Sequence, residues 1–464
     1  MKFYLLILSL IFVSASSLTE PEEELLKQGL ELEAQGRYEQ ALDLWTEAFT
    51  ELETPSLAIG REFVRVAAGN GLESYYPLAN NIYFWGLSAQ TVEVNSQALE
   101  EELLFLEPLV ERSVYKKWNA LYLENDPEIY RQIHLFWRRI DPSPGTSYNA
   151  RLIEHWERIT YARENFTINT HSVYQTDERG VSWVKYGKPD RQYSGTLQVS
   201  GGQVESVIAN LDPLLPELKR ETLARTTLDI HEYPRYEIWI YEKPNAQMEF
   251  NLIQIFGDRP SGGYSRIQTI DDFISSRAFT SSGRHEGLVS GRRSEIAGGS
   301  RLTPGMIFQW LYYEQLAAKD FYFSNIFSEM LRDWQGDPRS GANQRFGKHS
   351  GQVLRQNTEA AALLNLNRAP SEMSTYEKEF PEIPLQAYHY RMLDEQGRPV
   401  AATFVESRPL QAFLEDLSLN NSAIFPTDDV SAEEGFAHYE LSHGLQYFGS
   451  DGEMLSQIRM PTGL

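Results

Sequence analysis

Apolar residues recur every three to four positions along the first third of the chain, which is the spacing of amphipathic helices. Within residues 22–52 this spacing predicts two helices joined by a tight turn at Gly36. Further segments have the same spacing: residues 59–68, 75–87, 99–122, 127–139 and 149–166. Residues 16–125 are therefore predicted to form packed helical hairpins, with residues 99–122 as the third pair.

In the middle of the chain the spacing changes to the alternation that is typical of strands. Residues 181–186 and 236–241 alternate in this way and predict two strands. A turn at residues 242–245 leads into a third predicted strand at residues 248–256. Residues 126–270 are therefore predicted to form an α+β module, an antiparallel meander with helices on one face.

Beyond residue 270 the chain becomes rich in serine, glycine and arginine, then returns to helical spacing and ends in alternation. Residues 271–302 are predicted to be a loop. Residues 303–380 are predicted to be a helical segment, which starts at an N-cap threonine followed by proline and includes a helix at residues 352–366. Residues 381–464 predict a small β-sandwich-like domain, complete or incomplete. The predicted fold class is thus multidomain α+β.

Length and composition limit the classes of protein to consider. With 464 residues, 41% of them hydrophobic, the chain is expected to form about two to four folded domains. Its formal net charge of −23 argues against a nucleic-acid partner, because such binding relies on lysine and arginine neutralising phosphates. The absence of cysteine excludes disulfides, thiol nucleophiles and cysteine-ligated metals, and the nine histidines show no short metal-binding spacing. The sequence predicts no cofactor and no metal site.

The first fifteen residues have the pattern of a secretory signal peptide. Lys2 precedes an apolar run at residues 3–13, and Val13 and Ala15 are the small residues of a cleavage site. The run is short for an uncleaved membrane anchor, which is the alternative. No later stretch reaches eighteen apolar residues, so a mature chain without a transmembrane segment is expected. The predicted location is the periplasm, outer surface or exterior of a Gram-negative bacterium.

The first predicted hairpin has the spacing of a tetratricopeptide repeat. Gly29, Ala41 and Ala48 are small enough to let two helices approach closely, and Tyr38 and Trp45 would fill the seam between them. One repeat cannot bury its own apolar face, so neighbouring helices are required. Two interpretations follow: a protein-binding groove around Tyr38 and Trp45, or a helical spacer that packs on the next domain.

A series of short motifs lies between residues 130 and 269: FWRRIDPSPGT, ARENF, TDERG, KYGKPD, YEIWIY and GGYSR. In this order they resemble the GWxTD-domain family, exported proteins found mainly in Bacteroidota and related bacteria and often preceded by tetratricopeptide helices. The sequence departs from the family at its naming motif, where VYQTD (residues 173–177) replaces Gly-Trp-x-Thr-Asp. The resemblance implies architecture and location, and it implies no catalytic residue.

The same region contains a candidate polar cluster, which consists of Asp141, Thr176, Asp177, Arg179, Lys185, Asp190 and Glu237. Two carboxylates on either side of a sugar would suit glycoside hydrolysis, with Trp183 and Trp239 as sugar platforms. Aspartate beside proline or glycine also caps turns and helices, and strand tryptophans are commonly buried. The structural interpretation is favoured, with Arg179 and Lys185 paired with the carboxylates.

A second candidate site lies in the predicted loop and consists of Arg277, Arg284, Arg292, Arg293 and Arg301. The loop is interpreted either as a flexible connection or as a contact surface for an anionic partner, which would be a glycan or the protein's own acidic helices.

Taken together, these patterns predict an exported, non-enzymatic interaction or assembly scaffold of the cell envelope with an unidentified protein partner. The alternative is a carbohydrate-active or glycan-binding protein that uses the carboxylates and aromatic residues of the central module.

Overall fold

The computed structural model describes residues 20–143, 146–168, 170–213, 215–244, 251–259, 263–279, 302–335, 369–375, 385–393, 399–407, 441–448 and 454–462. These residues form thirteen α-helices, a four-stranded antiparallel sheet and two two-stranded sheets, so the chain is mixed α+β, as predicted. The chain divides into two compact units. The first comprises Met1–Leu103, Arg112–Glu157 and Ser374–Leu464, and the second comprises Leu104–Glu111 and Arg158–Met373.

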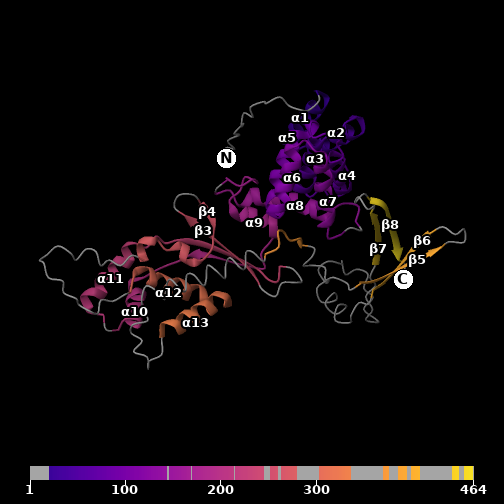
Figure 1. The fold of residues 1–464 in the computed structure, drawn as a ribbon. Coiled ribbons are helices and arrows are strands. Elements are labelled where there is room, and N and C mark those ends of the chain that lie inside the picture. Colours follow the sequence, from indigo (N-terminus) through magenta and orange to yellow (C-terminus); the bar gives the residue numbers. More distant parts are fainter. Residues whose placement is uncertain are drawn as a thin grey trace, which may run out of the picture. The chain divides into compact units, whose positions relative to one another are not determined.

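The first unit begins with helices that follow the predicted segments (Figure 1). They are α1 (Glu20–Ala34), α2 (Tyr38–Glu51), α3 (Leu57–Gly69), α4 (Tyr76–Gly86), α5 (Ser96–Leu106), α6 (Arg112–Leu123) and α7 (Glu128–Arg139), with short 3-10 turns at Glu73–Tyr75, Glu93–Asn95 and Glu107–Leu109. Helix α1 packs on α2 and α3 packs on α4, as two hairpins. The predicted third pair differs, because a 3-10 turn separates α5 from α6 and α6 packs against α7. The predicted boundary at residue 125 therefore falls between two helices of one unit.

The first hairpin is held together by a tryptophan that packs on a glycine. Trp45 is fully buried, and its indole N–H donates to the Leu25 carbonyl at 3.2 Å. A Cβ atom at Gly29 would lie 2.2 Å from the Trp45 ring, so only glycine fits there. Gly36 joins the two helices with a φ of 75°, in the left-handed region. Trp45 fills the seam as predicted, but the prediction for Tyr38 is wrong, because this side chain is 36% exposed.

A buried chain of hydrogen bonds connects four helices of the first unit. Arg61 on α3 donates to Glu102 on α5 at 2.9 Å, and the Tyr83 hydroxyl on α4 donates to the other Glu102 oxygen at 2.5 Å. The Trp137 indole on α7 donates to the Tyr83 oxygen at 2.8 Å. Burial raises the pKa of Glu102, and it raises that of Tyr83 well above its usual value. Because every link is buried and bonded, the chain fixes α4 relative to α7.

The second unit contains the four-stranded sheet, in the order β1-β2-β3-β4. Its strands are β1 (Arg191–Thr196), β2 (Arg235–Tyr241), β3 (Leu252–Arg259) and β4 (Gly263–Ile267), and each pairs antiparallel with the next. The predicted strand at residues 236–241 is β2, and residues 252–256 of the next predicted strand lie in β3. Strand β1 has no predicted counterpart, because its sequence RQYSGT contains only one large apolar side chain.

One predicted strand of this region is wrong. Residues 181–186 belong to helix α9 (Glu178–Tyr186). The Asp177 side chain accepts the backbone N–H of Arg179 at 2.9 Å and thereby caps the helix, and Gly187 ends it with a φ of 71°. An N-cap and a left-handed stop therefore outweigh the strand propensity of the valine, tryptophan and tyrosine between them.

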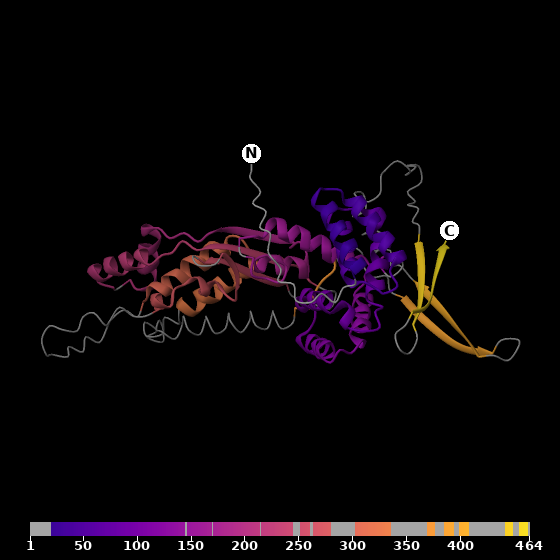
Figure 2. The same cartoon turned by 90° about the horizontal axis from the view of Figure 1, so that it is seen from above.

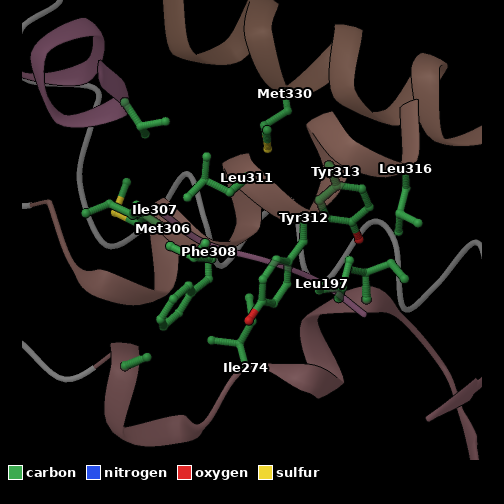
Figure 3. Packing of buried hydrophobic residues seen from close by; sticks show 14 of the residues in the cluster. Leu197, Ile274, Met306, Ile307, Phe308, Leu311, Tyr312, Tyr313, Leu316 and Met330 are labelled. Carbon is green, nitrogen blue, oxygen red and sulfur yellow. The ribbon is translucent and has the colours of Figure 1, made fainter. Parts of the chain in front are cut away.

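Four helices pack on the face of the sheet opposite α9: α10 (Gly201–Leu211), α11 (Glu217–Asp229), α12 (Pro304–Ala317) and α13 (Phe321–Gln335). Alternate residues of β2, Tyr236, Ile238 and Ile240, belong to the same buried cluster as these helices. Figure 2 shows the orange helices α12 and α13 alongside the strands, and Figure 3 shows their packing. Phe308 and Tyr312 stack there with ring centroids 5.6 Å apart.

The same core corrects the predicted boundaries at residues 270 and 303. Helices α12 and α13 share the core of the sheet, so the predicted helical segment is not separate from the module at its start. Thr303 caps α12 by accepting the N–H of Met306, as predicted. The predicted loop begins with two 3-10 turns, Ile270–Phe273 and Ser276–Phe279, which pack on α12.

Helix α8 (Ala150–Asn165) contains the division between the two units. The C-terminal strands form two antiparallel hairpins, β5 (Leu385–Leu393) with β6 (Pro399–Ser407) and β7 (Leu441–Phe448) with β8 (Met454–Thr462). The predicted signal peptide, the predicted helix at residues 352–366 and most of the predicted sandwich lie outside the described residues. Within the described part, no helix combines the length and hydropathy that crossing a bilayer requires.

Candidate functional site

The VYQTD motif forms the approach to α9 in the second unit. Tyr174 is fully buried, and its hydroxyl donates to the Phe105 carbonyl at 2.7 Å. Gln175 has a φ of 61°, which is uncommon for a residue other than glycine. A Cβ atom at Gly180 would lie 2.2 Å from the Thr176 hydroxyl oxygen, so α9 packs on the motif only with glycine at that position. The motif therefore shapes the backbone around the start of α9.

Three of the predicted polar residues form one buried ion-pair network, which we call the Arg179 network: Asp177, Arg179 and Glu237. The Arg179 guanidinium donates to Asp177 at 2.7 Å and to Glu237 at 2.8 Å. The three residues are only 2%, 7% and 5% exposed, respectively. Burial alone would lower the pKa of Arg179, but its hydrogen bonds to the two carboxylates raise it. The guanidinium also lies 3.9 Å from the centroid of the Tyr264 ring.

The remaining Glu237 oxygen is also occupied. It accepts a hydrogen bond from Gln192 at 2.5 Å and one from the Trp239 indole at 2.7 Å. Asp177 in turn caps α9, which is the structural interpretation of this residue. A glycosidase needs one carboxyl to donate a proton and another to attack or activate water. Because Arg179 binds both carboxylates inside the protein, this arrangement does not provide such a pair.

In the described part of the chain, the other predicted members of the cluster form no ion pair in the Arg179 network. The Thr176 hydroxyl donates to the backbone carbonyl of Asp177 at 3.0 Å. Asp141 belongs to the first unit. Asp190 accepts the backbone N–H of Glu242 at 2.7 Å, in the turn that follows α9. Burial lowers the pKa of Lys185 to about 8, and the nearby charge of Arg266 adds to the effect. Among the described residues, no ion pair or hydrogen bond joins Lys185 to a carboxylate of the cluster, and the carboxylate that acts on its pKa is Glu372, which is not a member. The predicted pairing of Lys185 is therefore wrong.

The predicted arginine-rich site falls largely outside the described residues. Arg277 lies in the 3-10 turn Ser276–Phe279, next to the buried Ala278. The other members, Arg284, Arg292, Arg293 and Arg301, lie outside the described part of the chain. The proposed anion contact stays a prediction.

A pocket of about 840 Å³ in the first unit forms a site that the sequence pattern does not predict. Its walls are α4, α7 and the segment before α8, and its lining includes Asn81, Phe84, His134, Arg138, Asp141 and Tyr148. Helix α4 contributes residues three apart and α7 residues four apart, so each pair lies on one face of its helix. The Tyr83–Trp137 hydrogen bond holds these two helices together behind the pocket. We call this site the α4–α7 pocket.

His134 is a neutral group in this pocket. Its ring lies against that of Phe84, with centroids 4.5 Å apart and planes tilted by 31°. Burial lowers the pKa of His134 to about 4, and the charge of Arg138 contributes to the shift. At neutral pH the imidazole therefore offers one N–H donor and one nitrogen acceptor.

Asp141 and Tyr148 stand on the segment that leads into α8. Asp141 accepts the backbone N–H groups of Ser143 at 3.0 Å and of Ala150 at 3.3 Å, and burial raises its pKa. Asp141 is thus the capping residue that the sequence predicts. The Tyr148 ring packs edge to face on Tyr76, with centroids 5.4 Å apart, and burial raises the pKa of its hydroxyl.

Of the pocket residues, only Asp141 was among the predicted candidates. The others lie on separate helices, and no sequence motif brings them together. One signal was available on α7, where Arg131, His134 and Arg138 recur with helical spacing beside its buried face.

Within the described residues, no group of three or more histidine, aspartate or glutamate side chains is placed to hold a metal ion. Comparison of the chain with protein-family models, curated protein sequences and solved structures gives no match.

Proposed function

We propose that this protein is an exported, non-enzymatic scaffold of a bacterial cell envelope that binds a protein partner through its helical hairpins. The Arg179 network carries the proposal. It occupies the two carboxylates, Asp177 and Glu237, that a catalytic centre in the central module would use. Those residues then contribute to stability, and binding surfaces elsewhere carry the function.

Two further observations support a scaffold. The hairpins α1–α2 and α3–α4 pack next to each other, and stacked helical hairpins present an extended surface for their size. The ordered motifs that resemble the GWxTD-domain family support export and a cell-envelope location, and we propose membership of that family on these motifs.

The surface of the first hairpin is the proposed contact for the partner, because Leu30 on α1 and Tyr38 on α2 are apolar side chains at the surface. The test is in-cell chemical crosslinking of the Leu30→Glu/Tyr38→Glu variant, followed by mass spectrometry of the crosslinked proteins. A matched control carries Val114→Glu/Leu123→Glu on α6, where two apolar side chains are likewise exposed.

We expect the hairpin variant to lose its major crosslinked partner and the control to keep it, with both variants melting at the wild-type temperature. An identical set of crosslinked proteins for the wild type and both variants would overturn the role of this hairpin.

A further inference from the structure

The α4–α7 pocket has the size and chemistry of a ligand site, and nothing in the proposed scaffold function uses it. We infer that this pocket binds a polyhydroxylated ligand, a saccharide of about one to three sugar rings. The inference does not depend on the protein partner, because the pocket lies between α4 and α7 and the proposed contact lies on α1 and α2.

The volume fits such a ligand. Pockets that bind small molecules commonly measure about 300–1,000 Å³, and this one measures about 840 Å³. Its walls come from three separate segments of the first unit, and the buried Tyr83–Trp137 bond holds two of them in place. The site is therefore preformed, which reduces the entropy lost on binding.

The polar groups in the pocket both donate and accept hydrogen bonds. Neutral His134 presents one donor and one acceptor, the Tyr148 hydroxyl can act as either, and the Asn81 carboxamide has both. Within the described part of the chain, no hydrogen bond is among the interactions that shift the pKa of His134 or of the Tyr148 hydroxyl. Their contacts there are the ring contacts with Phe84 and Tyr76. Each hydroxyl of a sugar is likewise both donor and acceptor, so a sugar satisfies this set better than a purely anionic or cationic ligand does.

The charges of the described residues that line the pocket are balanced. Arg131 forms a salt bridge with Glu128 at 2.8 Å, and the lining further contains Arg138 and Asp141. With His134 neutral, these two cations and two carboxylates sum to zero formal charge. A phosphate or an acidic peptide would favour a net positive site, so the balance favours a neutral polar ligand.

Aromatic rings complete the site. Phe84 and His134 form a tilted pair on facing helices, and Tyr148 lies on the third wall. The C–H faces of a sugar ring are apolar and pack on aromatic rings, while its equatorial hydroxyls reach the polar groups around them.

The test uses purified protein on an array of neutral and acidic di- and trisaccharides, followed by calorimetric titration with the sugars that bind most strongly. Tyr148→Phe removes one pocket hydroxyl and keeps the ring. Tyr76→Phe is the matched control. The Tyr76 ring packs on Tyr148, but its hydroxyl donates to Glu157, which lies outside the pocket, and this variant removes only that hydroxyl. His134→Phe removes both nitrogens and keeps a ring against Phe84.

We expect saturable binding of at least one neutral sugar. Loss of one hydrogen bond should weaken binding about threefold to tenfold in Tyr148→Phe, and further in His134→Phe, with Tyr76→Phe unchanged. Ser88→Trp, at the exposed rim of the pocket, should abolish binding without touching the core.

The inference is overturned if no sugar on the array binds, or if the three pocket variants, Tyr148→Phe, His134→Phe and Ser88→Trp, bind as the wild type does. It is also overturned if fluorescein-labelled hexaglutamate binds in place of sugars and Arg138→Gln weakens that binding at least tenfold while Arg139→Gln does not. Both arginines lie on α7 and both changes remove one charge, but only Arg138 lines the pocket.

Discussion

Replacing Arg179 by methionine tests how much the buried ion pairs of the Arg179 network contribute to stability. The substitution keeps a long apolar side chain but removes the guanidinium that binds Asp177 and Glu237, which are 2% and 5% exposed. Two carboxylates would then remain buried without their counter-charge. Removing one partner of a buried ion pair costs about 3–5 kcal/mol. This is a large part of the free energy of unfolding of a typical domain, which is about 5–15 kcal/mol.

The contribution of Glu237 is separated by a double-mutant cycle. Glu237→Gln neutralises one carboxylate and keeps the acceptor for Gln192 and the Trp239 indole. The double variant Arg179→Met/Glu237→Gln should therefore be less destabilised than the sum of the single variants, with a coupling energy of about 0.5–3 kcal/mol.

Unfolding in urea, followed by tryptophan fluorescence, measures these free energies. Two tryptophans report on the network: Trp239 donates to Glu237 directly, and the ring centroid of Trp183 lies 6.0 Å from that of Trp239. Arg235→Met is the control, because Arg235 is an exposed residue whose ion pair with Asp258 lies at the surface and should be worth about 1 kcal/mol or less. If Arg179→Met lost no more stability than Arg235→Met, with the dependence of the unfolding free energy on urea unchanged, the stabilising role of the buried Arg179 network would be refuted.

Three more predictions concern single positions. Gly180→Ala should cost about 1–3 kcal/mol, because its Cβ would lie 2.2 Å from the Thr176 hydroxyl oxygen, whereas Gly202→Ala on α10, with open space around it, should be neutral or stabilising in thermal melts. The pKa of His134 falls from about 6.5 in the unfolded chain to about 4 in the fold, so its contribution to stability is complete above pH 6.5 and is lost as the pH falls towards 4. The loss reaches about 2.5 kcal/mol at pH 4.5. His134→Phe should remove this loss of stability, which urea titrations at pH 7 and pH 4.5 measure. The pKa of Lys185 is likewise lowered, to about 8, so Lys185→Met should stabilise the protein by about 1–3 kcal/mol at pH 7; an advantage that did not shrink between pH 8 and pH 10.5 would contradict this account.

The periodicity of apolar residues predicted most of the helices. Each of these helices buries one face against a neighbour, so its apolar residues recur about every 3.6 positions. Periodicity failed at residues 181–186, where alternation suits a strand but the Asp177 cap and Gly187 impose helix α9. It also led to no prediction for β1, α10 or α11. Strand β1 is mostly polar, and α11 has only two buried residues, Ala224 and Thr227.

The candidate sites were predictable only where the contacts are local. The capping roles of Asp141 and Asp177 follow from neighbours within a few positions. The pairing of Arg179 with Glu237, 58 residues apart, depends on how α9 lies over β2, which no short motif encodes. The α4–α7 pocket depends on the same kind of distant packing, because the Tyr83–Trp137 bond spans 54 residues.

The Arg179 network also bears on how related chains can be found by sequence. In VYQTD the Tyr174 hydroxyl donates to a backbone carbonyl, whereas the Asp177 side chain both caps α9 and binds Arg179. A search that requires glycine and tryptophan at the start of the motif would therefore miss chains that keep the aspartate cap and its ion pair with the arginine. A pattern built on Thr-Asp-x-Arg-Gly, followed by Glu-x-Trp in a later strand, would recover them. In related chains that lack the arginine, we expect the strand glutamate to be replaced as well.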